Sequence, residues 1–345
     1  MFYIHHTSCI SPQKTFADID IENAKYPVEN KLLVVEPVYE SIPLNILRRM
    51  GKAVRISVGA ALPICRQNMD GIIIGTANGG MEDCIKFLNQ IIEYDEGMLT
   101  PTNFVQSTTN AVAGQIGLLT SNRGYNCTHV HRGLAFENAV IDVDMLLKEN
   151  TSNKYLLGGV DEISAYNYNI ELLGNWYKKE KISGSNLYES NSPGTIAGEG
   201  VAMFSVSSVQ SNALAAMQGI RILHSEDENQ VAEILQKFIQ QNIHPGEKID
   251  LLLSGENGDS RFLKYYEACE KVTGKEISVG RFKHVFGEYP TVSALAVWLA
   301  CNILKEQSIP EHLLKYCSAK KKFSKILIYN NYKGIQHSFI LLSKA

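Results

Sequence analysis

Asp70-Gly71-Ile72-Ile73-Ile74-Gly75-Thr76 is a short apolar run that a second glycine pair, Gly79-Gly80, follows closely. Three consecutive isoleucines are typical of a strand that is buried on both faces, and the glycines predict the turn that ends it. Residues 154–159 and 201–206 have the same form. Amphipathic helical stretches lie between such runs, at residues 81–92, 228–241, 259–271 and 291–305. This alternation predicts an α/β protein.

Two other local patterns predict single elements. Pro43 precedes apolar residues that recur at helical spacing from Ile46 to Leu62, so one helix is expected there. Residues 325–329 and 338–342 are both apolar and close together, which predicts a terminal β-hairpin.

Composition excludes several classes of function. The chain has 345 residues, of which 45% are hydrophobic, and its net charge is −3. This balance does not favour nucleic acid or an anionic membrane as the main partner. The most apolar stretch, residues 292–304, is too short to span a bilayer, and the first ten residues lack the pattern of a signal peptide. No nucleotide-binding motif and no HExxH motif occurs.

The cysteines predict a reducing compartment. Seven are scattered along the chain, and no two form a CxxC pair. This pattern favours free thiols in the cytoplasm over a disulfide framework or a zinc knuckle.

Five glycine-containing motifs then occur in a fixed order between residues 70 and 201. Each one alone fits an ordinary tight turn. In this order and with these gaps, they resemble the β-ketoacyl synthase family. The motifs are Asp70–Thr76 with Gly79-Gly80, Pro101–Phe104 with Asn110–Ile116, Gly124–Thr128, Leu157–Glu162 and Pro193–Val201.

The resemblance implies a thiolase-like, five-layer αβαβα fold made of two similar halves. Residues 1–208 are expected to form the N-terminal ketosynthase-like half, through which family members dimerise. Residues 209–345 are expected to form a shortened C-terminal thiolase-like half.

The catalytic cysteine of that family is missing from its expected position. Counting nine residues on from Gly124 places the nucleophile at Gly133, and Ala139-Val140 keeps the downstream register. Glycine cannot carry an acyl group, so no acyl transfer to this position is expected. Cys127 is a fallback nucleophile, but it lies in the preceding strand, where a cysteine is more often simply packed in the core.

His129 and His131 form a His-x-His pair in the same region. Alternate residues of a strand share a face, so the two could bind a metal. No third ligand is evident in the sequence, and polar residues near an altered pocket floor are the favoured interpretation.

Both histidines that the resemblance implies are also replaced. Ser254 takes the place of the first, and Glu288 takes the place of the second in a motif that retains Lys283. A competing register makes His284 the second histidine, but it loses the lysine. The expected gate loop, Asn331 to Gln336, retains one aromatic residue, Tyr332.

These replacements favour a non-condensing subunit, similar to the chain-length factors of flexirubin or aryl-polyene pigment clusters. Such a subunit would pair with an active ketosynthase as a heterodimer, with a homodimer as the alternative, and would use an acyl carrier protein. It would need no cofactor beyond acyl groups on the carrier's phosphopantetheine. The residues expected to line the acyl tunnel or the dimer interface are Asn103, Phe104, Thr108 and Asn110; His131, Lys283 and Tyr332 are expected at the pocket or gate.

Two alternatives remain open. The first is a divergent 3-oxoacyl synthase or acyltransferase with its chemistry relocated to Cys127 or His284. The second is a scaffold that binds acyl carrier protein and has no role in an acyl tunnel.

Overall fold

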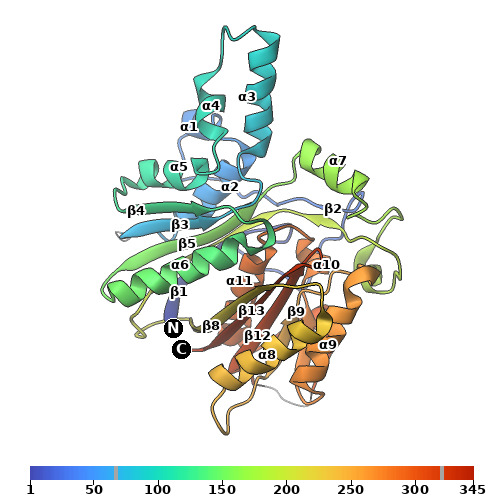
Figure 1. Cartoon of the computed structure of the whole chain (residues 1–345). Coiled ribbons are helices and arrows are strands. Elements are labelled where there is room, and N and C mark those ends of the chain that lie inside the picture. The colour runs from blue at the N-terminus through green and yellow to red at the C-terminus, as the bar shows by residue number, and fades with distance from the viewer. Residues whose placement is uncertain (66–68, 319–321) are drawn as a thin grey trace.

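The computed structural model describes residues 1–65, 69–318 and 322–345, which fold into alternating layers of helices and sheet (Figure 1). In the N-terminal half, five strands lie in the order β4-β3-β5-β7-β1. Their bounds are Phe2–Ile10 for β1, Gly71–Gly75 for β3, Tyr125–His129 for β4, Lys154–Asp161 for β5 and Gly200–Ser207 for β7.

The C-terminal half repeats this arrangement. Its strands lie in the order β10-β9-β12-β13-β8, with β11 added at the outer edge. In each half, the first two pairings in this order are parallel and the next two are antiparallel. The bounds are Ala215–His224 for β8, Leu251–Ser254 for β9, Ser278–Arg281 for β10, Leu314–Tyr316 for β11, Lys325–Tyr332 for β12 and Gln336–Lys344 for β13.

The two halves are joined through β1 and β8, which pair antiparallel at Phe2↔Met217, Tyr3↔Ala216 and Ile4↔Ala215. A single hydrogen-bonded network of 11 strands therefore runs through both halves. A separate two-stranded sheet, β2 (Lys31–Leu32) with β6 (Ala197–Gly198), lies beside it. The proposed boundary near residue 208 stays a prediction.

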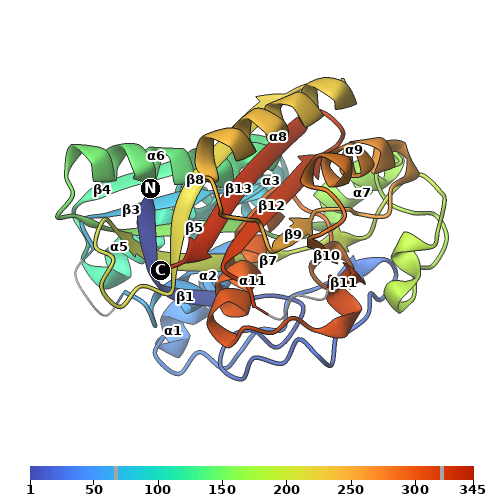
Figure 2. The same ribbon diagram turned by 90° about the horizontal axis from the view of Figure 1, so that it is seen from below.

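Helices make the other three layers (Figures 1 and 2). The helices α2 and α5 cover the outer face of the N-terminal strands, α6 and α11 lie between the two halves, and α8 and α9 cover the C-terminal strands. The five-layer fold is thus confirmed. The bounds are Lys52–Ala61 for α2, Ala111–Thr120 for α5, Ala135–Glu149 for α6, Val292–Glu306 for α11, Glu228–Asn242 for α8 and Leu263–Thr273 for α9.

The apolar stretch near residue 300 forms α11, which is buried along almost its whole length between the two halves. Its hydrophobicity is therefore that of a central core helix. None of the helices in the described ranges has both the length and the apolar character needed to cross a bilayer.

The helix expected from Pro43 to Leu62 is wrong in its extent. The structure has two helices, α1 (Leu44–Leu47) and α2, separated by Gly51 in an extended conformation. A Cβ atom on Gly51 would lie 1.9 Å from Oδ2 of Asp83, so a larger residue there would displace the Asp83 side chain. The apolar period continued across this break and concealed it.

The glycine-rich turn after β3 is held by a buried carboxylate. Asp161, at the end of β5, accepts hydrogen bonds from the backbone N–H groups of Ala77 (2.9 Å) and Asn78 (2.7 Å). The Thr291 hydroxyl, just before α11, donates to its other oxygen at 2.8 Å. Gly75 ends β3 without a side chain because a Cβ atom there would lie 2.5 Å from the backbone nitrogen of Phe136. The two halves therefore meet closely at this end of the sheet.

Candidate functional site

The expected nucleophile position lies at the sharp turn between β4 and α6. Arg132 has a left-handed conformation, with φ of 49°, and Gly133 follows it in a buried 3-10 turn. The turn therefore keeps the strand-to-helix geometry that presents a residue to the space between the halves, but the presented residue has no side chain.

An aromatic residue occupies the space that a side chain at position 133 would need. A Cβ atom on Gly133 would lie 2.3 Å from Cβ and 2.4 Å from Cγ of Tyr332, at the end of β12. The backbone N–H of Gly133 donates to the Oε1 atom of Gln336 at 2.9 Å. A side chain thus occupies the place expected for a nucleophile, and a protein acceptor already takes the backbone N–H of Gly133.

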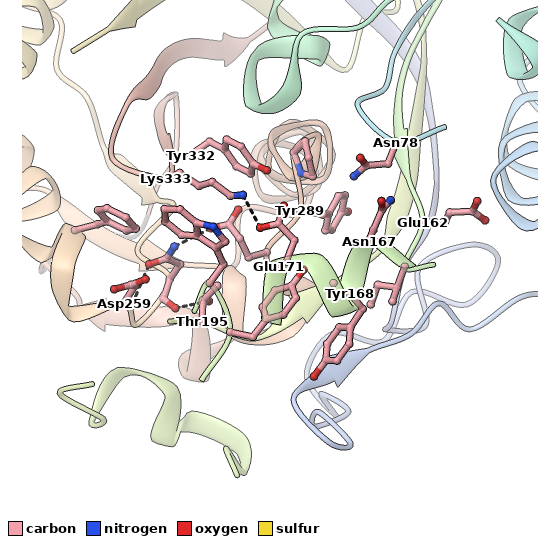
Figure 3. A pocket seen from close by; sticks show the side chains of 18 residues that line it. Asn78, Glu162, Asn167, Tyr168, Glu171, Thr195, Asp259, Tyr289, Tyr332 and Lys333 are labelled. Carbon is pink, nitrogen blue, oxygen red and sulfur yellow. Dashed lines mark hydrogen bonds and ion pairs between the residues drawn. The ribbon is translucent and has the colours of Figure 1, made fainter. Parts of the chain in front are cut away.

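The cavity next to Tyr332 is small. It encloses about 50 Å³, and aromatic side chains narrow it (Figure 3). A water molecule needs roughly 10–15 Å³ measured in this way, so the cavity holds a few waters and no acyl chain. The aromatic residues that line it are Tyr168, Trp176, Tyr177, Phe262, Tyr289 and Tyr332.

A buried ion pair lies at the wall of this cavity. The Lys283 ammonium is 2.6 Å from Oε2 of Glu288, and the Asn257 side-chain amide donates to the same oxygen at 2.8 Å. Lys283 is fully buried, and its burial lowers its pKa while the adjacent carboxylate opposes that change. The negative charge of Glu288 is thus matched by Lys283, and a carboxylate paired in this way does not donate a proton as a catalytic histidine does.

A second buried carboxylate faces the same region from α6. The Ser338 hydroxyl donates to Oε1 of Glu137 at 2.7 Å. Burial raises the pKa of Glu137 to about 7, although hydrogen bonds from serines and the positive charge of Lys283 act in the other direction. Glu137 therefore adds a second buried carboxylate near Lys283.

An ion pair lies among the residues that line the cavity. Lys333 lies 2.5 Å from Oε2 of Glu171 in α7 (Ala165–Leu173), and its ammonium is 4.5 Å from the centre of the Trp176 ring (Figure 3). Lys333, which belongs to the expected gate loop, thus links that loop to α7.

Comparison with known proteins agrees with this geometry. Residues 25–172 match the sequence profile of the β-ketoacyl synthase N-terminal domain. The curated protein sequences include no match to this chain.

Solved ketosynthase structures match over the whole chain. The ishigamide ketosynthase/chain length factor has a TM-score of 0.78 at 12% identity and is matched over 100% of this chain and 99% of its own. A ketosynthase in complex with its chain length factor from Xenorhabdus doucetiae has a TM-score of 0.76 at 11% identity, over 100% and 98%. A type II polyketide acyl-carrier protein in complex with its ketosynthase has a TM-score of 0.79 at 10% identity. The match covers 100% of this chain and 99% of the solved one. At such identities, the likeness establishes the ketosynthase fold.

The other expected synthase residues are dispersed. Ser254 is fully buried at the end of β9, where its hydroxyl accepts a bond from the backbone N–H of Glu256 at 3.3 Å. His284 lies outside the cavity, between the Tyr188 hydroxyl (3.0 Å) and the His312 ring (3.2 Å). Burial lowers the pKa of His284 to about 3, so its ring is neutral. This placement favours Glu288 over His284 as the residue that faces the site.

Two residues near β4 also lie away from the cavity. His131 was expected at the pocket, but it is exposed and its ring lies 5.5 Å from that of His224. The reason is that β4 ends at His129, before the turn that buries Gly133. Cys127 lies within β4, 3.8 Å from the ring of His129, and its thiol does not line the cavity.

The expected tunnel and dimer residues lie outside the cavity of their own chain. The helices α3 (Met81–Glu93) and α4 (Pro101–Gln106) form a protrusion that extends away from the sheets (Figure 1). Asn103 and Phe104 are on α4, while Thr108 and Asn110 lie in the exposed segment that follows it. Phe104 is 56% exposed, so this protrusion presents apolar surface to solvent.

Several residues of the site were not predicted from the sequence. Trp176 and Tyr177 lie in a loop without a motif, and Glu137 has only its place on the apolar side of α6 as a signal. Glu171 gave no signal, because its partner lies more than 160 positions away.

Proposed function

We propose that this chain is a non-condensing subunit of the chain-length-factor type, which pairs with an active ketosynthase and works on acyl groups held by an acyl carrier protein. The observation that carries this proposal is the Tyr332 side chain at the nucleophile position, above a glycine. The small cavity and the paired Glu288 support it, since no condensation chemistry has room or residues there.

The surface features support the pairing. In the described part of the chain, β4 is the last strand of its half of the sheet, and one of its edges is free to pair. The protrusion carries Phe104 at 56% exposure, together with other exposed apolar residues on α3 and α4. Patches of this kind mark protein interfaces. The other exposed residues are Leu88, Ile92 and Val105.

These surfaces indicate which part of the assembly each of the two subunits supplies. The partner supplies the nucleophile, and the protrusion of this chain walls the far end of the partner's acyl tunnel. Side chains at Thr108 and Asn110 then limit the number of carbons that fit. Acyl groups arrive on phosphopantetheine, so no resident cofactor is required. We place this assembly in the cytoplasm, where the seven free cysteines of the chain remain reduced.

The test is co-expression with the ketosynthase encoded beside this chain, followed by purification of the complex and incubation with malonyl- and acyl-carrier protein. We expect a heterodimer in which mass spectrometry finds the acyl group on the partner alone. Phe104→Asp should abolish co-purification, and Leu263→Asp, at an exposed apolar position in the C-terminal outer layer, should not. Thr108→Trp should shorten the products.

Other results would reject the proposal in distinct ways. An acyl adduct on this chain when purified alone would favour the enzyme with relocated chemistry. Binding of carrier protein without any ketosynthase partner would favour the scaffold.

A further inference from the structure

A cluster of metal-binding side chains lies on β4, outside the cavity. Because side chains of a strand alternate between its faces, Cys127 and His129 point to the same side. That side faces α6, which contributes Asp142. Asn126 and Thr128 point to the other side, where they bond to residues of α5 and its N-terminus.

The three side chains converge on one point. The Cys127 sulfur lies 3.8 Å from Nε2 of His129, and the same nitrogen lies 2.9 Å from Oδ2 of Asp142. All three atoms lie within 4.8 Å of one another. Around a tetrahedral zinc ion, with bonds of about 2.0–2.3 Å, ligand atoms are separated by roughly 3.2–3.8 Å. Small side-chain movements therefore suffice to place one ion between them.

The geometry does not fit a cysteine-histidine-aspartate triad. In a triad, the nucleophile and the carboxylate contact different nitrogens of the imidazole: one nitrogen takes the proton of the nucleophile, and the carboxylate accepts a hydrogen bond from the other. Here the thiol and the carboxylate both approach Nε2 of His129. The Cys127 sulfur, Nε2 of His129 and Oδ2 of Asp142 therefore lie close together, as the ligands of one ion do.

We propose that Cys127, His129 and Asp142 bind a divalent transition-metal ion, for which Zn²⁺ is the best match. A thiolate and a carboxylate balance the charge of the ion, and binding releases the thiol proton to solvent. The Tyr125 hydroxyl donates to Oδ2 of Asp142 at 3.1 Å and orients that ligand.

Three protein ligands leave a fourth position. All three side chains are partly exposed, so water or a group from a bound molecule can reach it. The site ties the outermost strand of the N-terminal half to α6. It does not depend on the proposed function, because no residue of the cavity takes part.

The test uses the full chain after removal of metals with a chelator. Cobalt(II) is titrated first, because a thiolate ligand gives an intense charge-transfer absorption near the ultraviolet, and zinc is then measured by competition with a chromogenic chelator. We expect one equivalent to bind. Cys127→Ser should remove the charge-transfer band, and His129→Gln and Asp142→Asn should weaken zinc binding at least tenfold.

Two matched variants serve as controls. Cys84→Ser removes another partly exposed thiol, and His131→Asn removes the neighbouring histidine; both should bind metal as the wild type does. Thermal unfolding of the metal-free proteins verifies that each variant is folded. The proposal is overturned if the cobalt spectrum lacks a band that depends on Cys127, or if all variants bind zinc equally.

Discussion

Restoring a cysteine at position 133 should not restore a nucleophile. The Cβ atom that Gly133→Cys introduces would lie 2.3 Å from Cβ of Tyr332, where an ordinary contact needs at least 3.4 Å. Because the opposing atom is a Cβ, no rotation of the Tyr332 side chain relieves the overlap of more than 1 Å. The end of β12 or the start of α6 must move instead, and overpacking of this kind costs about 3 kcal/mol.

The measurement is urea unfolding of the wild type, Gly133→Cys and Gly133→Ala, with the alanine variant separating the steric effect from that of the thiol. Both variants should lose about 3 kcal/mol in the free energy of unfolding. Tyr332→Gly removes the opposing atoms, so the double variant with Gly133→Ala should lose at least 1 kcal/mol less than the sum of the single variants.

An acylation assay tests independently that a cysteine at position 133 is not a nucleophile. Incubation of Gly133→Cys with an acyl thioester should produce no acyl adduct at position 133 in mass spectra. The reasoning is refuted if Gly133→Cys is as stable as the wild type within about 0.5 kcal/mol, or if its thiol becomes acylated.

Three further perturbations test the buried charges. Burial raises the pKa of Glu137 from 4.5 to about 7, so the folded state binds the proton more tightly and wild-type stability should fall as the pH rises from 4.5 to 7. Glu137→Gln should remove about 3 kcal/mol of this fall in the free energy of unfolding. Equal pH profiles of the two proteins in urea unfolding would contradict the assignment. Lys283→Met should cost about 3–5 kcal/mol because it leaves Glu288 charged without its partner, and adding Glu288→Gln should recover part of the loss. Lys333→Met should speed amide hydrogen exchange in α7 and lower the free energy of unfolding by less than about 1 kcal/mol, and Glu171→Gln should have the same effect. Unchanged exchange in both variants would show that the ion pair does not hold α7.

The fold was accessible from the sequence because its signals are local. The isoleucine run of β3, the period of α8 and the closely spaced strands β12 and β13 each specify an element within about ten residues. The break at Gly51 was missed because the apolar spacing continues from α1 into α2 across it.

The site, too, could be predicted from the sequence only where its signals are local. Counting along motifs predicted the places of Gly133, after β4, and of Glu288, after α10 (Lys283–Phe286), because these motifs are local in the sequence. The contacts that decide what these positions can do come from other elements. Tyr332 over Gly133 joins residues about 200 positions apart, and no sequence pattern encodes the distance between them.

The position of β1 in the sheet sets the order in which the chain can fold during synthesis. Residues 3–10 pair with residues 201–207, and residues 2–4 pair with residues 215–217. At a synthesis rate of roughly 5–20 residues per second, β1 waits on the order of 10–40 s for its first partner strand. In that interval an apolar strand is available to chaperones and to other chains. Nascent chains halted before residue 200 should therefore be cleaved by protease within β1, while chains halted well beyond residue 220 should be protected there; equal protection in both would exclude this order of folding.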